Sequence, residues 1–287
     1  MSDKSNWFLF EIVDWCRKFP MYFSDFWKQL GWDNNTIYQQ LRYFYNKENN
    51  KFSHTRKKHR PEFDYILQEI REYIDLHWLT TIQICELGCG DGRFYGYLKD
   101  NLTDIEIKYV WVDFSQSFIK QADKDYDDVN AKRIAKDISD YLKSTKQEQF
   151  DFIVCIASYQ HLFWYQRMPF LRLCYRSLKR EWLLIMTNWA RSSWFVFKYL
   201  SSVIWSMLRF VLLLFTRAWW DVLVPFVSWW ERYFRFYHIF PKRQLIKLFK
   251  LSWFVIKKVW FVSREWSWWD DFDTNANTLV VGKKDIM

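Results

Sequence analysis

A short glycine-rich stretch that follows an apolar run constrains the fold of this 287-residue chain more than any other feature. The apolar run 81–85 leads into residues 86–92, which hold three of the chain's six glycines, and a helix-like run 93–99 follows. Glycine lets the backbone adopt positive φ and approach a ligand closely. A strand, a glycine loop and a helix in this order are typical of a parallel α/β sheet that binds a nucleotide-like ligand.

An acidic residue ends the next apolar run and narrows the kind of ligand. Asp113 closes residues 107–113 and lies 21 positions after Gly92. An acid at the end of this strand accepts hydrogen bonds from ribose hydroxyls. The loop has neither the further glycine of a nicotinamide fingerprint nor the Lys-Ser/Thr pair of a phosphate loop. The pattern therefore favours a nucleoside that is bound without a long phosphate chain.

Several ordered segments resemble the class I S-adenosylmethionine (SAM)-dependent methyltransferases. Residues 86–92, 112–115 and 135–138 resemble their first three motifs, and 150–156 and 183–187 read as their fourth and fifth strands. The resemblance implies an α/β, doubly wound, Rossmann-like sheet of seven strands, the last two at about 253–262 and 277–282. It implies SAM as cofactor, bound by Arg56, Glu86, Gly88, Cys89, Gly90, Gly92, Asp113, Ser115, Asp137 and Ile138. The alternative is another doubly wound domain that binds a different nucleotide.

The rest of the chain divides around this sheet. We expect a helical N-terminal extension at 1–44, a methyltransferase domain at 45–287, and a substrate-side insertion at 191–240 between the fifth and sixth strands. The apolar run 203–215 inside the insertion is too short and too interrupted by basic residues to span a membrane. We expect it to form a helical lid over the substrate; an interfacial amphipathic helix is the alternative.

Charge is distributed unevenly along the chain. The net charge is +9, yet residues 79–155 carry 10 basic and 14 acidic side chains, whereas 191–264 carry 13 basic and two acidic ones. Basic segments on both sides of an acidic core favour a polyanionic partner such as tRNA; a solvated lysine-rich surface is the alternative. Five scattered cysteines without zinc-ligand spacing predict a reducing, cytoplasmic location and no metal site.

Two patches outside the cofactor segment carry a narrower resemblance. They are Tyr45-Asn46 with residues 52–56, and residues 221–226 with 235–240 and 244–245. Together they resemble the eukaryotic tRNA methyltransferases that esterify 5-carboxymethyluridine at the wobble position, including the methyltransferase domain that is fused to an AlkB-type oxygenase. The chain departs from that pattern at Phe226, Phe236 and Gln244. These departures leave the cofactor motifs intact and bear on the identity of the substrate.

This second resemblance implies site residues and a reaction. Arg235, Tyr237 and His238 are expected to hold the acceptor carboxylate, His161 to face the methyl group, and Lys57, Lys58, Lys242 and Arg243 to bind tRNA. For residues 235–238 a packed strand or helix end is the alternative, and for His161 a capping or core role. A methyltransferase of a small metabolite and a non-catalytic RNA-binding module are the other functions considered. The eukaryotic relatives use a small activating protein, so such a protein is a candidate partner here; the sequence does not decide whether one is needed.

Tryptophan and glycine have unusual frequencies. The chain has 20 tryptophans and six glycines, whereas glycine makes up about 7% of ordinary proteins. Trp111, Trp182 and Trp253 occupy positions where the methyltransferases that the chain resembles carry glycine. The hypothesis is that many of these tryptophans are UGA codons that the source organism reads as glycine. The alternative is a truly tryptophan-rich chain with a membrane-interface belt.

Overall fold

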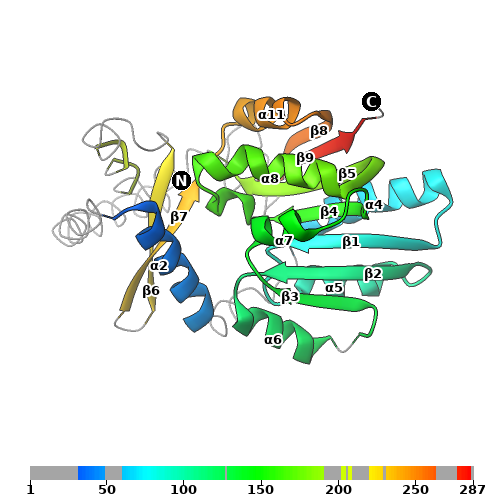
Figure 1. Cartoon of the computed structure of the whole chain (residues 1–287), viewed down its shortest axis with the longest axis horizontal. Helices are drawn as coiled ribbons and strands as arrows, with labels where there is room; N and C mark the ends of the chain where they lie inside the picture. Colours follow the sequence, from blue (N-terminus) through cyan, green and yellow to red (C-terminus); the bar gives the residue numbers. More distant parts are fainter. Residues whose placement is uncertain are drawn as a thin grey trace, which may run out of the picture.

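The central sheet has the seven strands that the sequence predicts. The computed structural model describes residues 32–48, 60–126, 128–190, 202–204, 206–208, 220–228, 231–262 and 277–285. Seven strands form one sheet in the order β3-β2-β1-β4-β5-β9-β8 (Figure 1). The first five of these strands run parallel, and β9 is antiparallel to both β5 and β8. Their bounds are Thr81–Leu87 (β1), Glu106–Asp113 (β2), Ala131–Ala135 (β3), Phe150–Ile156 (β4), Leu178–Trp189 (β5), Phe254–Val262 (β8) and Asn277–Lys284 (β9).

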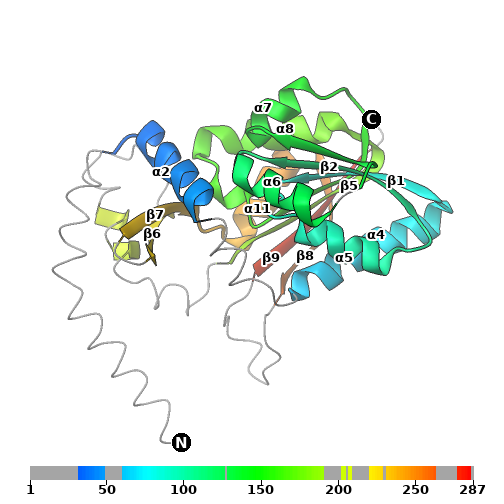
Figure 2. The same cartoon turned by 90° about the horizontal axis from the view of Figure 1, so that it is seen from below.

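Helices cover both faces of this sheet, as expected for a doubly wound fold. Figure 2 shows α4 and α5 on one side and α7 and α8 on the other. Residues of α4, α5 and α6 pack with one set of strand side chains, and residues of α7, α8 and α11 pack with the other set. Because both faces are covered, all seven residues of β4 are buried and six of them are apolar. The exception, Asp151, accepts the backbone N–H of Gln83 and pairs with Lys179. The helix bounds are Pro61–His77 (α4), Arg93–Asn101 (α5), Gln116–Asp125 (α6), Ile138–Ser144 (α7), Trp164–Ser177 (α8) and Lys242–Leu251 (α11).

A separate hairpin and one helix lie beside the carboxyl ends of the parallel strands. The hairpin consists of β6 (Asp221–Ser228) and β7 (Glu231–His238), and α2 (Asn34–Lys47) packs along it (Figure 1). Apolar residues of α2 and the hairpin form shared clusters. Helix α2 crosses the boundary at residue 44 that we expected from the sequence. The sequence did not predict the hairpin, whereas the described residues of the predicted helical run, at 203–204 and 206–208, are helical.

The apolar run 203–215 lies mostly outside the described residues. Within the described part of the chain, no helix is long and apolar enough to cross a membrane.

Candidate active site

The glycine loop between β1 and α5 has the backbone that its sequence predicts. Gly88, Gly90 and Gly92 have φ of +78°, +56° and +79°, a region that side chains other than glycine rarely adopt. A Cβ on Gly88 would lie 2.1 Å from Oγ of Ser158, so a larger residue would collide there. Gly92 begins α5 and does not line the pocket, whereas Gly88, Cys89 and Gly90 do. The loop thus brings bare backbone to the pocket wall.

Asp113 lies at the end of β2, where the sequence predicted the ribose acid. Its carboxylate accepts hydrogen bonds from the backbone N–H of Gly90 at 3.0 Å and of Ser115 at 2.8 Å. Burial raises the pKa of this carboxyl to about 6. Each carboxylate oxygen can accept a second hydrogen bond, so ribose hydroxyls can be bound in addition. Ser115 itself is buried and caps α6, and its hydroxyl contacts Asn46 instead of the pocket.

Glu86 lies near the end of β1 on the same pocket wall. Its carboxyl accepts a hydrogen bond from the Tyr109 hydroxyl at 3.0 Å and is 3% exposed. Burial raises its pKa to about 8; the Tyr109 hydrogen bond opposes this rise, and the nearby acids Asp91 and Asp113 add to it to a smaller extent. A cationic ligand beside Glu86 would stabilise its ionised form and so offset the effect of burial. Two buried acids with raised pKa values on one wall therefore fit a positively charged nucleoside such as SAM.

The third predicted acid, Asp137, lies at the opposite end of the pocket, beyond β3. Its carboxylate caps α7 by accepting the N–H groups of Ser139 and Asp140, and it accepts the Tyr38 hydroxyl at 2.8 Å. Ile138 lines the pocket beside it. The pocket therefore runs from Asp137, past Asp113, to Glu86. This is the order in which an adenine, a ribose and a methionine chain would follow one another.

Beyond the cofactor end, the pocket is walled by aromatic side chains and one histidine. Nδ1 of His161 lies 2.6 Å from the carbonyl oxygen of Phe236, which assigns the proton to Nδ1 and leaves Nε2 as an acceptor. The hydroxyl of Tyr45 lies 3.2 Å from that Nε2. The rings of Trp189 and Tyr237 stack with centroids 4.3 Å apart, and the His161 ring lies 4.6 Å from that of Tyr237. Of the four predicted catalytic residues, His161 and Tyr237 line the pocket.

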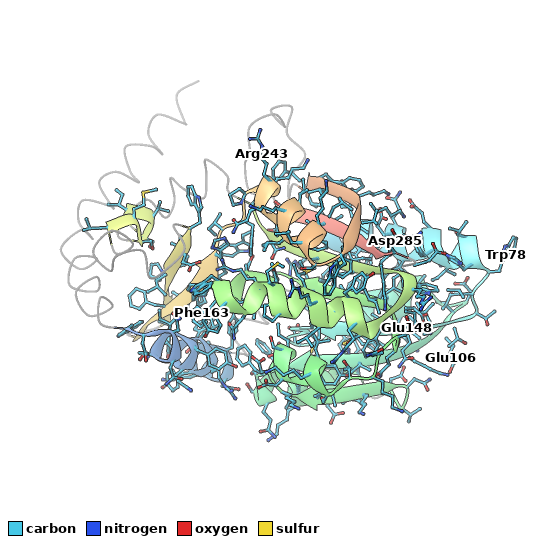
Figure 3. All side chains as sticks on the ribbon, turned by 45° about the horizontal axis from the view of Figure 1, so that its top comes forward. Trp78, Glu106, Glu148, Phe163, Arg243 and Asp285 are labelled. Carbon is cyan, nitrogen blue, oxygen red and sulfur yellow. The ribbon has the colours of Figure 1, made fainter. Side chains whose placement is uncertain are left out.

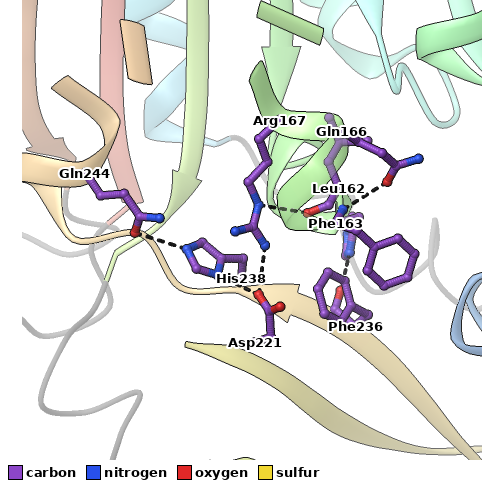
Figure 4. A network of polar contacts seen from close by, with 9 residues as sticks. Leu162, Phe163, Gln166, Arg167, Asp221, Phe236, His238 and Gln244 are labelled. Carbon is purple, nitrogen blue, oxygen red and sulfur yellow. Dashed lines mark hydrogen bonds and ion pairs between the residues drawn. The ribbon is translucent and has the colours of Figure 1, made fainter. Parts of the chain in front are cut away.

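His238 lies outside the pocket wall, in a buried polar network (Figure 4). Its Nδ1 contacts Asp221 at 2.7 Å and its Nε2 contacts Gln244 at 3.1 Å. Arg167 holds the same Asp221 carboxylate at 2.8 Å and also donates to the carbonyl oxygen of Leu162. Burial lowers the pKa of His238, so the imidazole is neutral and the ion pair is that of Arg167 with Asp221. This network joins the hairpin to α8 and α11, which differs from the predicted contact with an acceptor.

Arg235 is also buried behind the pocket. It does not line the pocket, and its guanidinium lies over the rings of Phe44, Phe226 and Tyr237 at 5.3, 5.1 and 5.3 Å from their centroids. Contacts of a guanidinium with three ring faces stabilise packing of α2 against the hairpin. The structure thus matches the alternative of a packed strand more closely than a carboxylate clamp.

The predicted tRNA-binding residues are only partly within the described chain. Arg56, Lys57 and Lys58 lie outside the described residues. Lys242 and Arg243 begin α11 and do not line the pocket. Figure 3 shows Arg243 pointing away from the sheet, on the outer side of α11.

Several pocket residues were not predicted from the sequence. Tyr38, Leu41 and Tyr45 line the pocket from α2, and Arg60 and Phe63 line it from the start of α4. The spacing of three and then four residues in α2 places its three side chains on one helix face. That spacing is the signal that was available, although it does not tell what the face contacts.

Comparison with known proteins agrees with this geometry. The family model described as a methyltransferase domain matches residues 84–181. A SAM-dependent methyltransferase from Methanosarcina mazei has a TM-score of 0.58 and 16% identity, covering 72% of this chain and 94% of that chain. The 1,6-didemethyltoxoflavin-N1-methyltransferase of Burkholderia thailandensis, solved with its substrate and S-adenosylhomocysteine, has a TM-score of 0.57 and 11% identity, covering 89% and 92%. No curated protein sequence matches the chain significantly.

At these identities the structural likeness concerns the fold, and the family match concerns the segment with the glycine loop and the acids. Residues 84–181 therefore match a methyltransferase domain, and the pocket that they help to form has the glycine loop and the acids that fit SAM.

Proposed function

We propose that the protein transfers the methyl group of SAM to the carboxylate of a modified wobble uridine in tRNA. The observation that supports this substrate best is the acceptor end of the pocket, where the rings of Trp189 and Tyr237 stack beside Tyr45 and His161. Aromatic side chains in such a wall bind splayed-out RNA bases by stacking. The resemblance of residues 221–226 and 235–240 to the wobble-uridine enzymes supports the same substrate.

The chemistry requires little of the protein beyond alignment. A carboxylate is ionised near neutral pH and attacks a sulfonium methyl group without a base. The Tyr45 hydroxyl reaches the pocket from α2 and donates its one proton to Nε2 of His161. It is the donor that we assign to the acceptor carboxylate, and it must turn from His161 when the substrate binds. Arg235 and His238 act as positioning residues, because they hold the strand that carries Tyr237.

Charge supports a polyanionic substrate. Residues 191–264 carry 13 basic and two acidic side chains, and α11 contributes Lys242, Arg243, Lys247 and Lys250 to this set. Counterion release from such a surface makes tRNA affinity depend steeply on salt. The small activating protein and the cytoplasmic location remain predictions.

One observation favours a second candidate, a methyltransferase of a small metabolite. Nε2 of His161 is an unprotonated acceptor at the pocket, which suits an acceptor that must lose a proton, such as a phenol or an amine. For a carboxylate acceptor, His161→Gln should preserve most of the turnover, whereas for a protonated acceptor it should lose roughly 100-fold or more.

Nucleoside mass spectrometry of tRNA from cells with and without the gene tests the proposal. We expect the methyl ester of a carboxymethylated wobble uridine to disappear with the gene and to return with the wild-type gene. Purified enzyme should also methylate tRNA from the deletion strain. An unchanged tRNA nucleoside profile, together with loss of a methylated metabolite, would establish the second candidate instead.

A further inference from the structure

We propose that Arg60 binds the α-carboxylate at the methionine end of SAM. The proposal rests on SAM as the cofactor and is independent of the methyl acceptor. Arg60 lies immediately before Pro61, at the start of α4, and lines the pocket together with Phe63, Glu86 and Gly88.

The position of Arg60 along the pocket fits this end of the ligand. Asp137 lies beyond β3 and Asp113 at the end of β2. Arg60 pairs with Glu62, which in turn contacts Asn277 at the start of β9. Asn277 pairs with the last residue of β5, on the opposite side of β1 from β2 and β3. A nucleoside with adenine at Asp137 and ribose at Asp113 therefore directs its amino-acid chain toward Arg60.

The guanidinium has unused hydrogen-bonding capacity. Its Nη2 donates to Glu62 at 2.8 Å, and the side chain is 12% exposed. Among the described residues, its Nε is buried and has no hydrogen-bond partner. An arginine has five donors in a fork that matches the two oxygens of a carboxylate. The second basic residue of this wall, Arg93, is held by Asp91 at 2.7 Å.

Comparison of SAM with 5′-methylthioadenosine tests the proposal, because the latter has the adenosine and the methylated sulfur but no amino-acid chain. In calorimetry, Arg60→Gln should weaken SAM binding about 10- to 100-fold, the range for a hydrogen bond to a charged group. Binding of 5′-methylthioadenosine should remain unchanged. Arg60→Lys should restore part of the SAM affinity, because lysine keeps the charge and lacks the fork.

Two controls separate this role from a structural one. Arg71 lies in the same helix, α4, and forms an exposed ion pair with Asp104. Arg71→Gln removes this pair and should leave the affinities for SAM and for 5′-methylthioadenosine unchanged. Asp113→Ala should weaken both ligands, since both contain the ribose. Equal losses of both ligands in Arg60→Gln would show that Arg60 only supports the fold, and unchanged SAM affinity would also overturn the proposal.

A different set of observations carries a second inference: Trp78 and Trp253 stand where the natural protein has glycine. Both follow the end of a helix, α4 and α11 respectively, and both have left-handed backbone with φ of +53° and +69°. Glycine is the usual residue at this position, because a Cβ disfavours left-handed backbone. The Trp78 side chain is 91% exposed, so packing does not offset its strain, whereas Trp253 is 50% exposed and contacts Tyr175 and Arg172 with its ring.

Tryptophans at the turn of the hairpin and in β2 support the same inference. Ser228 pairs with Glu231, so two residues connect β6 to β7, and the sequence has Trp229-Trp230 there. Connections of this length favour glycine at positive φ. Trp111 in β2 is fully buried, and its indole Nε1 has no partner among the described residues, although a buried indole usually finds one. Tryptophan thus stands at two helix ends with left-handed backbone and in the connection between β6 and β7, where glycine is favoured. We attribute this to UGA codons that the source organism reads as glycine.

Two measurements test this inference: the codons of the gene, and peptide mass spectrometry of the protein from its native source. We expect UGA codons and glycine masses at positions 78 and 253. UGG codons, or tryptophan masses, would overturn it. In the recombinant protein with tryptophan, the double variant Trp78→Gly, Trp253→Gly should raise the melting temperature, whereas replacement of Tyr65, an exposed aromatic residue inside α4, by glycine should lower it.

Discussion

The raised pKa of Glu86 predicts that SAM affinity increases with pH in the neutral range. Burial raises this pKa from 4.5 to about 8 in the free enzyme, whereas a bound cation favours the ionised carboxylate. SAM must therefore displace a proton below pH 8. One pKa unit corresponds to about 1.4 kcal/mol, so the penalty is about 2.7 kcal/mol at pH 6 and about 1.4 kcal/mol at pH 7. Affinity should rise about ten-fold from pH 6 to pH 7 and level off above pH 8.

The same shift fixes the sign of a stability effect. The pKa of Glu86 is raised in the folded protein, so its contribution to stability is fully present below the unfolded value of 4.5. That contribution is lost as the pH rises through the folded value of about 8. The stabilisation that saturating SAM provides in thermal unfolding should accordingly increase between pH 6 and pH 7.

Calorimetric titration in two buffers of different ionisation enthalpy measures both the affinity and the protons released. We expect release of close to one proton per SAM at pH 6 and a flat profile for Glu86→Gln. Burial raises the pKa of Asp113 to about 6, so Asp113 contributes to the pH dependence of SAM affinity at lower pH than Glu86 does. Titration of Asp113→Asn separates the contributions of the two groups. An affinity that is constant from pH 6 to pH 7, or an unchanged slope in Glu86→Gln, would refute the reasoning.

Three further predictions follow from the contacts. Asp113→Ala should weaken SAM binding ten-fold or more, and Asp137→Ala less, because the second carboxylate already caps a helix; calorimetry measures both. Reversal of charge at Lys242 and Lys247 should weaken tRNA binding and reduce its salt dependence while SAM affinity stays constant, as filter binding at several salt concentrations can show. His238→Ala should lower the free energy of unfolding by about 1–3 kcal/mol, because Asp221 loses a buried partner; denaturant unfolding measures this, and a stability equal to wild type would contradict it.

The cofactor half of the site follows from local sequence. A parallel strand that is buried on both faces must be apolar, and the loop after it needs glycine, so residues 81–92 specify both their conformation and their place. Asp113 follows for the same reason, because the ends of β1 and β2 meet at one edge of the sheet. The doubly wound sheet of seven strands and the positions of its last two strands, at 254–262 and 277–284, were predicted correctly.

The acceptor half does not follow from local sequence, because it depends on contacts between distant segments. Tyr45 reaches His161 across 116 residues, and His238 finds Asp221 across the hairpin instead of a ligand. A polar residue near the carboxyl end of a strand looks the same in the sequence whether it faces a pocket or a buried carboxylate. The hairpin was missed because its strands lie next to an apolar run that favoured a helix.

The cofactor half and the acceptor half of the site come from different parts of the chain, and this affects which residues determine the substrate. Residues 84–181 hold the glycine loop and the acids, and they are the part that matches the methyltransferase domain model. Tyr45 and Tyr237 come from α2 and β7, outside that segment, and they meet His161 at the acceptor end. Their packing partner Arg235 couples α2 to the hairpin, whereas α2 also reaches the cofactor end through the Tyr38 hydroxyl on Asp137. Substrate identity therefore depends on how α2 and the hairpin pack together, and substitutions in the hairpin should alter the KM of the acceptor before that of SAM.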